Sequence, residues 1–370
     1  MAEITRALIA RVGVDLAKLV IQVHGVDAAG RRVVGKALKR DQFLAWCAQL
    51  PAGCVVAMEA CSGAHHWARQ LRAMGLNARL IAANFVSPYR MEGKSGKNDM
   101  NDAAAICEAA SRPTMRFVPI KTAEQQGLMM LHRQREGFKE DRTACINRIR
   151  GALIEAGLAF GKSPKVLRAA LPDVLEDASN ALSGVGRLAL RQAFELWRQL
   201  DEHMHWCDRQ IGQHVRSSEQ ARRAAKITGI GEIGASALTA AVGDFGQFKS
   251  GAQFGAWLGL VPRQNSSGGK ASLGRITKRG DDYLRTLLIQ GAKSAVMSAQ
   301  KRDDPNSRWV QQLAARVGWQ KACVAMANKN ARILWAVMTR EDGFNPQHVS
   351  VKPKAKQAPP AQAERATACV

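Results

Sequence analysis

Val12-Gly13-Val14-Asp15 places a carboxylate in an apolar, strand-like run, and Val55-Val56-Ala57-Met58-Glu59 ends a second such run in the same way. Removing an ionised carboxylate from water costs several kcal/mol unless a cation or hydrogen bonds compensate. A functional role, such as binding a cation, is therefore needed to explain acids at these two strand positions. Together with Asp99 and Asp102, which stand at the expected start of a helix, they predict a divalent metal site.

Asp99 and Asp102 by themselves have two interpretations. Their three-residue spacing puts both side chains on one helical face, where both can bind the same ion. Acidic residues in a first helical turn also cap the helix and complement its dipole without any catalytic role. The prediction of a metal site therefore depends mainly on Asp15 and Glu59.

The surrounding pattern predicts a layered α/β domain. Alternating apolar residues predict three strands in succession, and strands and helices then alternate. The expected strands are 7–16, 19–26, 31–38, 54–59 and 78–82, with helices over 41–50 and 63–74. The basic segment 91–98, which contains Lys94 and Lys97, is expected to form a loop over the acidic site.

Residues 122–220 are expected to be helical. Trp197, Leu200, Met204, Cys207 and Ile211 recur at alternating spacings of three and four, which is typical of a coiled-coil seam. An earlier helix over 123–156 carries many basic residues, and Pro164, Pro172, Gly184 and Gly186 mark the connection between the two. Such basic residues either contact a polyanion or form a solvated face.

The composition indicates a polyanionic partner. The 370 residues contain 54 Lys and Arg against 31 Asp and Glu, a formal net charge of +23. A charge excess of this size favours nucleic acid over a merely soluble role, and no long apolar segment supports a membrane. The 8 Cys are scattered without a zinc-like pattern, so reduced thiols and a cytoplasmic location are expected.

Two glycine-rich segments are candidates for contact with phosphate. Gly229 and Gly231 lie in a turn that opens a helix, a pattern that suits a helix-hairpin-helix grip on a nucleic-acid backbone, although glycine also serves simply for geometry. Further on, Ser266-Ser267-Gly268-Gly269 is either a flexible phosphate cradle or a loop that presents a hydroxyl nucleophile. Its basic neighbours are Arg263, Lys270, Arg275, Lys278 and Arg279.

The acids and these C-terminal elements together resemble the DEDD transposases of insertion sequences, the group that includes the Piv-type invertases. The resemblance covers roughly residues 7–339. It implies an α/β RuvC-like, ribonuclease-H-type N-terminal domain, a helical coiled-coil region, and a mainly α C-terminal transposase domain. The expected boundaries are 1–118, 119–222 and 223–342, followed by a disordered basic tail over 343–370.

The resemblance also implies functional roles. Asp15, Glu59, Asp99 and Asp102 would bind Mg²⁺, as two ions, and Ser267 would be the nucleophile, with Ser266 beside it. The partners implied are donor and target DNA, a non-coding bridge RNA that guides the enzyme, and further copies of the chain in a homo-oligomer, with the active protein at the nucleoid. A metal-dependent nuclease of the Holliday-junction resolvase type, which uses water instead of serine, and a non-catalytic nucleic-acid-binding protein are the alternatives.

Overall fold

The computed structural model describes residues 8–90, 99–265 and 272–348. The chain forms two compact units. The first contains residues up to 222 together with 232–248, and the second contains 223–231 and the residues from 249 onward. The predicted contacts at Lys94, Lys97, Ser267 and Lys270, and the tail beyond 348, lie outside the described residues.

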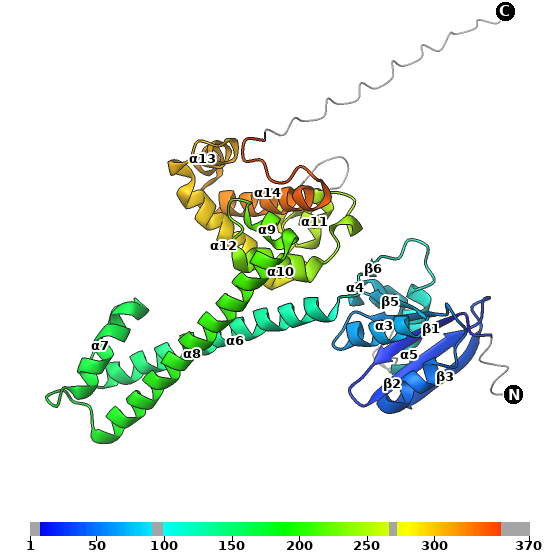
Figure 1. Ribbon diagram of the computed structural model, residues 1–370, viewed down its shortest axis with the longest axis horizontal. Helices are drawn as coiled ribbons and strands as arrows, with labels where there is room; N and C mark the ends of the chain where they lie inside the picture. The colour runs from blue at the N-terminus through cyan, green and yellow to red at the C-terminus, as the bar shows by residue number, and fades with distance from the viewer. Residues whose placement is uncertain (1–7, 91–98, 266–271, 349–370) are drawn as a thin grey trace, which may run out of the picture. The chain divides into compact units, whose positions relative to one another are not determined.

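The first unit contains a six-stranded mixed sheet in the order β3-β2-β1-β4-β5-β6 (Figure 1). The central strand β1 runs antiparallel to β2 and parallel to β4, and β5 continues the parallel set. The strands are Arg11–Leu16, Val20–Val26, Arg32–Lys39, Val55–Glu59, Asn77–Ile81 and Phe117–Val118, for β1 to β6. The mixed α/β fold of the ribonuclease H type is confirmed.

Alternation along β1 divides its side chains between two layers. Val12 and Val14 are fully buried on one face, in a core that also contains Phe43 and Trp67. Those two aromatic residues come from α2 (Phe43–Cys47) and α3 (Ala64–Ala73), and their rings meet edge to face at 5.2 Å. Since successive strand residues point to opposite faces, Gly13 and Asp15 belong to the other face of the sheet.

Helix α5 (Asp99–Ala109) covers that second face and approaches β1 at Gly13. A Cβ atom at position 13 would lie 2.1 Å from the carbonyl oxygen of Ala103 and 2.5 Å from the backbone nitrogen of Cys107. Only glycine permits this approach, because real Cβ atoms do not come so close to backbone. The close packing of α5 on β1 holds the acids at the start of α5 near the sheet.

Replacing Gly13 with Val is expected to lower the free energy of unfolding of the first unit by about 3 kcal/mol or more, because the added side chain meets the backbone of α5 rather than a flexible side chain. Urea denaturation followed by circular dichroism measures the change. The matched control is Gly127→Val in the long helix α6 (Ala123–Glu155), where a Cβ meets nothing within 4 Å and stability should change by less than about 0.5 kcal/mol. Native stability for Gly13→Val would contradict the close approach of α5.

The remaining elements of the α/β part are short. They are η1 (Arg40–Gln42) before α2, α4 (Ala83–Val86) after β5, and η2 (Ser87–Tyr89), which directly follows α4. A second small core behind the sheet contains Ala57, Val86 and Ile106, which come from β4, α4 and α5. This core ties η2 and α5 to the same end of the sheet.

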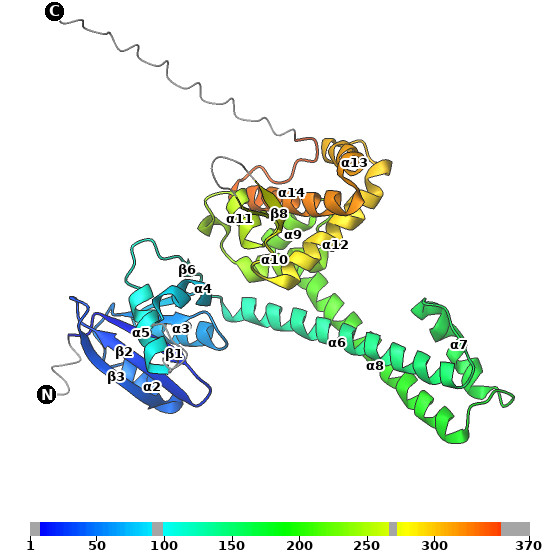
Figure 2. The same ribbon diagram turned by 180° about the vertical axis from the view of Figure 1, so that it is seen from behind.

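Two long helices, α6 (Ala123–Glu155) and α8 (Gly184–Ser217), lie side by side in both views (Figures 1 and 2). Thr122 and Gln125 form a capping box that starts α6. In the expected seam, Trp197, Leu200, Cys207 and Ile211 are buried. The expected connection contains a helix of its own, α7 (Pro164–Glu176), which tolerates Pro164 in its first turn and carries Pro172 inside.

Several basic residues of α6 have structural partners. Arg135 Nε donates to Asp208 Oδ1 at 2.5 Å, and Arg142 pairs with Asp201. These ion pairs join α6 to α8 and favour the structural interpretation of those side chains over a role in binding a polyanion. Helix α10 (Glu232–Val242) packs on the same pair of helices, where His132 and Ser236 share a buried hydrogen bond of 3.0 Å.

The second unit is mainly helical in its described residues, and its strands β7 (Pro262–Gln264) and β8 (Leu273–Ile276) pair in antiparallel fashion. Asp281 caps α12 by accepting a hydrogen bond from the backbone N–H of Leu284 at 3.0 Å. No helix in the described ranges is long and apolar enough to cross a membrane. The helices of the second unit are α11 (Gly251–Trp257), α12 (Asp282–Ser298), η4 (Ala299–Lys301), α13 (Pro305–Val317) and α14 (Trp319–Thr339). Helix α9 (Glu219–Ala225) begins in the first unit and ends in the second, and η3 (Phe245–Gln247) belongs to the first unit.

Candidate active site

The acids predicted from the sequence come from three elements that meet at one edge of the sheet. Asp15 lies near the carboxyl end of β1 and Glu59 is the last residue of β4. Because β1 and β4 are adjacent and parallel, their carboxyl ends lie at the same edge. Asp99 and Asp102 occupy the first turn of α5, which packs on β1. The tertiary structure therefore brings strand acids and helix acids together.

The pKa of Asp15 reports how strongly these charges interact. The pKa of Asp15 is raised from its ordinary value of 3.8 to about 6, first by burial and then by the carboxylates of Asp102, Asp99 and Glu59, in that order of importance. Arg90 acts in the opposite direction and lowers the same pKa. The four acids therefore form one electrostatic group around a half-buried carboxyl, with Arg90 as an opposing charge.

Arg90 contacts two of these acids directly. Its Nη2 donates to Glu59 Oε1 at 2.9 Å and its Nε donates to Asp102 Oδ1 at 2.8 Å. Glu59 and Asp102 are 16% and 17% exposed, whereas the Arg90 side chain is 41% exposed. Sequence reasoning missed Arg90, because a single arginine next to a basic loop has no pattern that separates it from an ordinary surface residue.

The acidic group has the chemistry of a divalent metal site. Within 8–90, 99–265 and 272–348, no three His, Cys, Asp or Glu side chains are already close enough together to coordinate one metal ion. The donors that are present are carboxylate oxygens, the ligands that Mg²⁺ prefers, and their mutual repulsion at Asp15 is relieved by added positive charge. Asp15, Glu59, Asp99 and Asp102 are the residues that would hold such an ion.

Replacing Asp15 with Asn is expected to stabilise the metal-free protein, and only above about pH 6. Because the folded state raises the pKa of Asp15, ionising this carboxyl lowers the stability of the fold. Below about pH 4 the carboxyl is protonated in both the folded and the unfolded state and nothing is lost. The stability is then lost as the pH rises through about 6. The shift corresponds to about 3 kcal/mol without screening, and to about 1 kcal/mol for a half-exposed group. Thermal melts in a chelator should give the variant a melting temperature a few degrees above that of the native chain at pH 8. At pH 4 the two melting temperatures should be equal. An equal difference at both pH values would contradict the repulsion.

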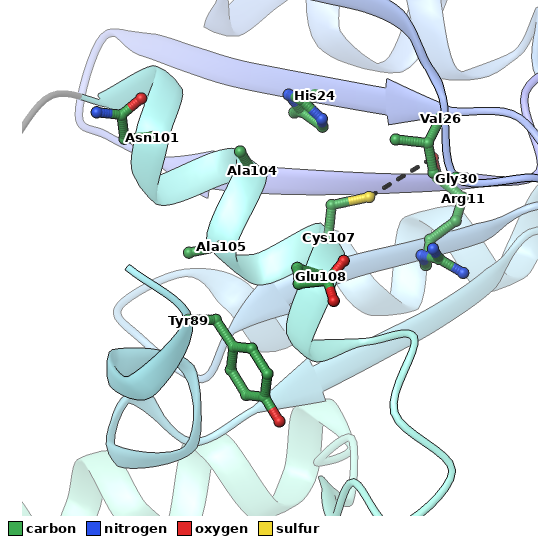
Figure 3. Close-up of a pocket in the computed structure, with 10 residues that line it drawn as sticks. All are labelled: Arg11, His24, Val26, Gly30, Tyr89, Asn101, Ala104, Ala105, Cys107 and Glu108. Atoms are coloured by element: carbon green, nitrogen blue, oxygen red, sulfur yellow. Dashed lines mark hydrogen bonds between the residues drawn. The ribbon is translucent and has the colours of Figure 1, made fainter. Parts of the chain in front are cut away.

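A cavity of about 250 Å³ lies beside α5, lined among others by Arg11, His24, Tyr89 and Cys107 (Figure 3). Cys107 points toward the backbone of Arg11, with Sγ 3.9 Å from the Arg11 carbonyl oxygen. Arg11 Nε and His24 Nδ1 are buried without a hydrogen-bond partner among the described residues. Asn101 also lines the cavity, which therefore reaches the turn of α5 that carries Asp102.

Gly229 and Gly231, the predicted phosphate contacts, differ in how closely they are packed. Gly229 has a φ of 89°, and a Cβ there would lie 2.9 Å from both the Gly291 carbonyl oxygen and Asn330 Nδ2. Asn330 Nδ2 also donates to the Thr228 carbonyl oxygen at 2.9 Å. This close packing of the turn on α12 and α14 accounts for Gly229. Gly231 is exposed in open space, and contact of either glycine with nucleic acid stays a prediction.

The serine residues predicted to supply the nucleophile lie outside the described residues, between the antiparallel strands β7 and β8. The backbone N–H of Asn265 donates to the Ser272 carbonyl oxygen at 2.9 Å, so the described residues that flank 266–271 are paired. Arg263 and Arg275 are exposed on the two strands, and Lys278 and Arg279 follow β8. The sequence predicts a loop at the Ser-Gly segment, which stays a prediction, and sequence reasoning missed the two short strands that flank it.

Comparisons with known proteins find transposases along most of the chain. A model described as the transposase IS116/IS110/IS902 family matches residues 221–307, and a second transposase model matches residues 12–157. A "Probable family 20 transposase" of Pseudomonas aeruginosa is 47% identical over 91% of this chain and 99% of its own length. The transposases for IS1111A of Coxiella burnetii and IS1328 of Yersinia enterocolitica are 42% and 36% identical, each over 90% of this chain and over 90% and 98% of their own lengths.

Proposed function

The chain belongs to the IS116/IS110/IS902 family of transposases, and from that premise we propose that it cuts and rejoins DNA with the acids Asp15, Glu59, Asp99 and Asp102 and the hydroxyl of Ser267. It is a DNA-cutting and joining enzyme whose DEDD domain implies use of a divalent metal. The observation that carries the proposal is the electrostatic grouping of the four acids at one edge of the sheet.

The proposed metal-binding acids come from two strands and one helix. Asp15 and Glu59 present carboxylate oxygens from adjacent strands, and Asp99 and Asp102 add theirs from the first turn of α5. Two Mg²⁺ ions held there would stabilise negative charge on the scissile phosphate. The raised pKa of Asp15 means that, in the metal-free protein, its carboxyl is increasingly protonated as the pH falls through about 6, so that protons compete with a cation there.

Ser267 supplies the nucleophile in this proposal. Its Oγ forms a bond to phosphorus, the bond between phosphorus and the 3′ oxygen breaks, the serine proton leaves with a base, and the 3′ oxygen takes up a proton. The phosphoserine link keeps the bond energy for rejoining, which agrees with the absence of a P-loop pattern in the sequence. The charge that develops on the phosphate would be stabilised by Arg263, Lys270, Arg275, Lys278 and Arg279.

Nucleic acid would contact the remaining basic residues. The net charge of +23 supports DNA binding through phosphates, and Lys94, Lys97, Gly229 and Gly231 are the further contacts that we propose. A bridge RNA would be held mainly by backbone and shape, while base pairing reads the DNA sequence. We propose that the active species is a homo-oligomer. Protein that carries no specific RNA, and gains no activity from one, would contradict guidance by RNA.

The experiment that tests the chemistry is cleavage of a labelled DNA junction that carries the element's ends. The reaction contains Mg²⁺ and co-purified RNA, and the products run on a denaturing gel with and without protease. A slow-migrating product that protease removes is expected, because a serine link leaves protein on the DNA. Free cleaved ends would instead support the alternative, a metal-dependent nuclease of the resolvase type in which water attacks; the ribonuclease-H-type sheet with acids at its edge is common to both mechanisms.

A further inference from the structure

Arg90 occupies an unusual position for a half-exposed arginine. Its guanidinium binds one acid from the sheet, Glu59, and one from helix α5, Asp102, through two separate nitrogen atoms. Each acid therefore has one carboxylate oxygen occupied by Arg90. Both acids are more buried than the arginine, so the guanidinium reaches into the acidic site from its solvent side.

We propose that Arg90 is the internal cation of the acidic site in the metal-free protein, and that a divalent ion must displace it in order to bind. This inference rests on the proposed function, because it takes the acids to be the metal ligands. A guanidinium is always charged, so it compensates the carboxylates at any physiological pH. The same positive charge repels an incoming divalent ion and occupies oxygens that the ion needs.

The position of Arg90 allows it to leave. It directly follows η2 (Ser87–Tyr89), and its backbone N–H donates to the Ser87 carbonyl oxygen at 3.2 Å. The 41% exposure of its side chain means that the guanidinium regains water when it moves out. Ion pairs with such an exposed partner are weak enough to exchange, which a deeply buried pair is not.

Binding of Mn²⁺ to the full-length protein, without DNA, tests the proposal. Electron paramagnetic resonance of free Mn²⁺ measures the affinity of the native chain and of Arg90→Gln, which removes the charge and keeps a shorter, polar side chain. We expect Arg90→Gln to bind Mn²⁺ about three- to ten-fold more tightly, because the competing cation is gone. In a chelator it should melt lower than the native chain, and Mn²⁺ should raise its melting temperature by more.

Two variants make the result specific. Arg90→Lys keeps a positive charge and should bind Mn²⁺ nearly as the native chain does. Arg112→Gln is the matched control, since Arg112 pairs with Glu108 at the other end of α5 and stacks over Tyr89 without an ion pair to the four acids. Its Mn²⁺ affinity should not change.

The outcomes separate this inference from the proposed function. Arg90→Gln protein that binds Mn²⁺ as weakly as the native chain, or more weakly, overturns the role of Arg90 as a competing cation and leaves the metal site intact. If Asp15→Asn leaves Mn²⁺ binding unchanged, or if neither the native chain nor Arg90→Gln binds Mn²⁺, the acids are not the metal ligands and both proposals fail.

Discussion

Replacing Asp15 with Asn is expected to reduce DNA strand cleavage by at least about 1000-fold, while the protein stays folded and still binds DNA. Asp15 lies on the central strand of the sheet, and its carboxyl is the one on which the charges of the other three acids act. Asn has the same shape and removes that charge without leaving a cavity. A loss of this size corresponds to about 4 kcal/mol in the activation barrier.

The measurement compares cleavage of the labelled junction by native and variant protein at saturating Mg²⁺, with a gel-shift assay for DNA binding. The matched control is Asp41→Asn, which makes the same chemical change at an exposed position in η1 and should cleave like the native protein. Cleavage by Asp15→Asn within about tenfold of the native rate would show that the acidic group is not the reaction centre.

Replacing Ser267 with Ala is expected to remove the protease-sensitive DNA product completely and to reduce rejoined product by at least about 1000-fold. The family resemblance assigns the nucleophile to this residue. Among the described residues around it, Asn265 and Ser272 are hydrogen-bonded, and Arg263 and Arg275 lie on the paired strands β7 and β8. Alanine removes only the hydroxyl oxygen. DNA binding and Mn²⁺ affinity should therefore stay at the native level.

Ser266→Ala is the control for this experiment, since it makes the same change one residue away. Loss of the linked product in Ser266→Ala, with normal product in Ser267→Ala, would move the nucleophile by one residue and leave the mechanism unchanged. Free cleaved ends that are formed equally well by both variants would support the nuclease that uses water.

Within the α/β part, local pattern was enough to predict most of the fold. The strands expected over 19–26 and 54–59 are β2 (Val20–Val26) and β4 (Val55–Glu59), and the helix expected to open at Asp99 is α5. These elements follow from alternation, helical periodicity and turn residues, which depend on neighbours in the chain. The segment after Gly157 was less predictable, because packing of Leu167 and Leu171 against α6 and α8 keeps α7 helical despite Pro172.

The candidate site was predicted as a list of acids and not as a geometry. Asp15 and Glu59 were identifiable because a charged group at the end of an apolar strand is costly, and that argument requires only the sequence. Arg90 was not identifiable, since its partners lie 31 residues earlier, at Glu59, and on a different helix, at Asp102. The packing role of Gly229 was equally hidden, because Gly291 and Asn330 lie far along the chain.

The sequence by itself determined the class of the fold, the polyanionic partner, and the acids that merit attention, since charge, periodicity and desolvation cost can be evaluated one segment at a time. Only the tertiary structure decided which of these residues meet. Parallel pairing of β1 with β4 puts Asp15 and Glu59 at one edge, and the close approach of α5 at Gly13 adds Asp99 and Asp102. Arg90 enters that group through contacts between distant segments, which depend on how the elements pack and not on the pattern within any one of them.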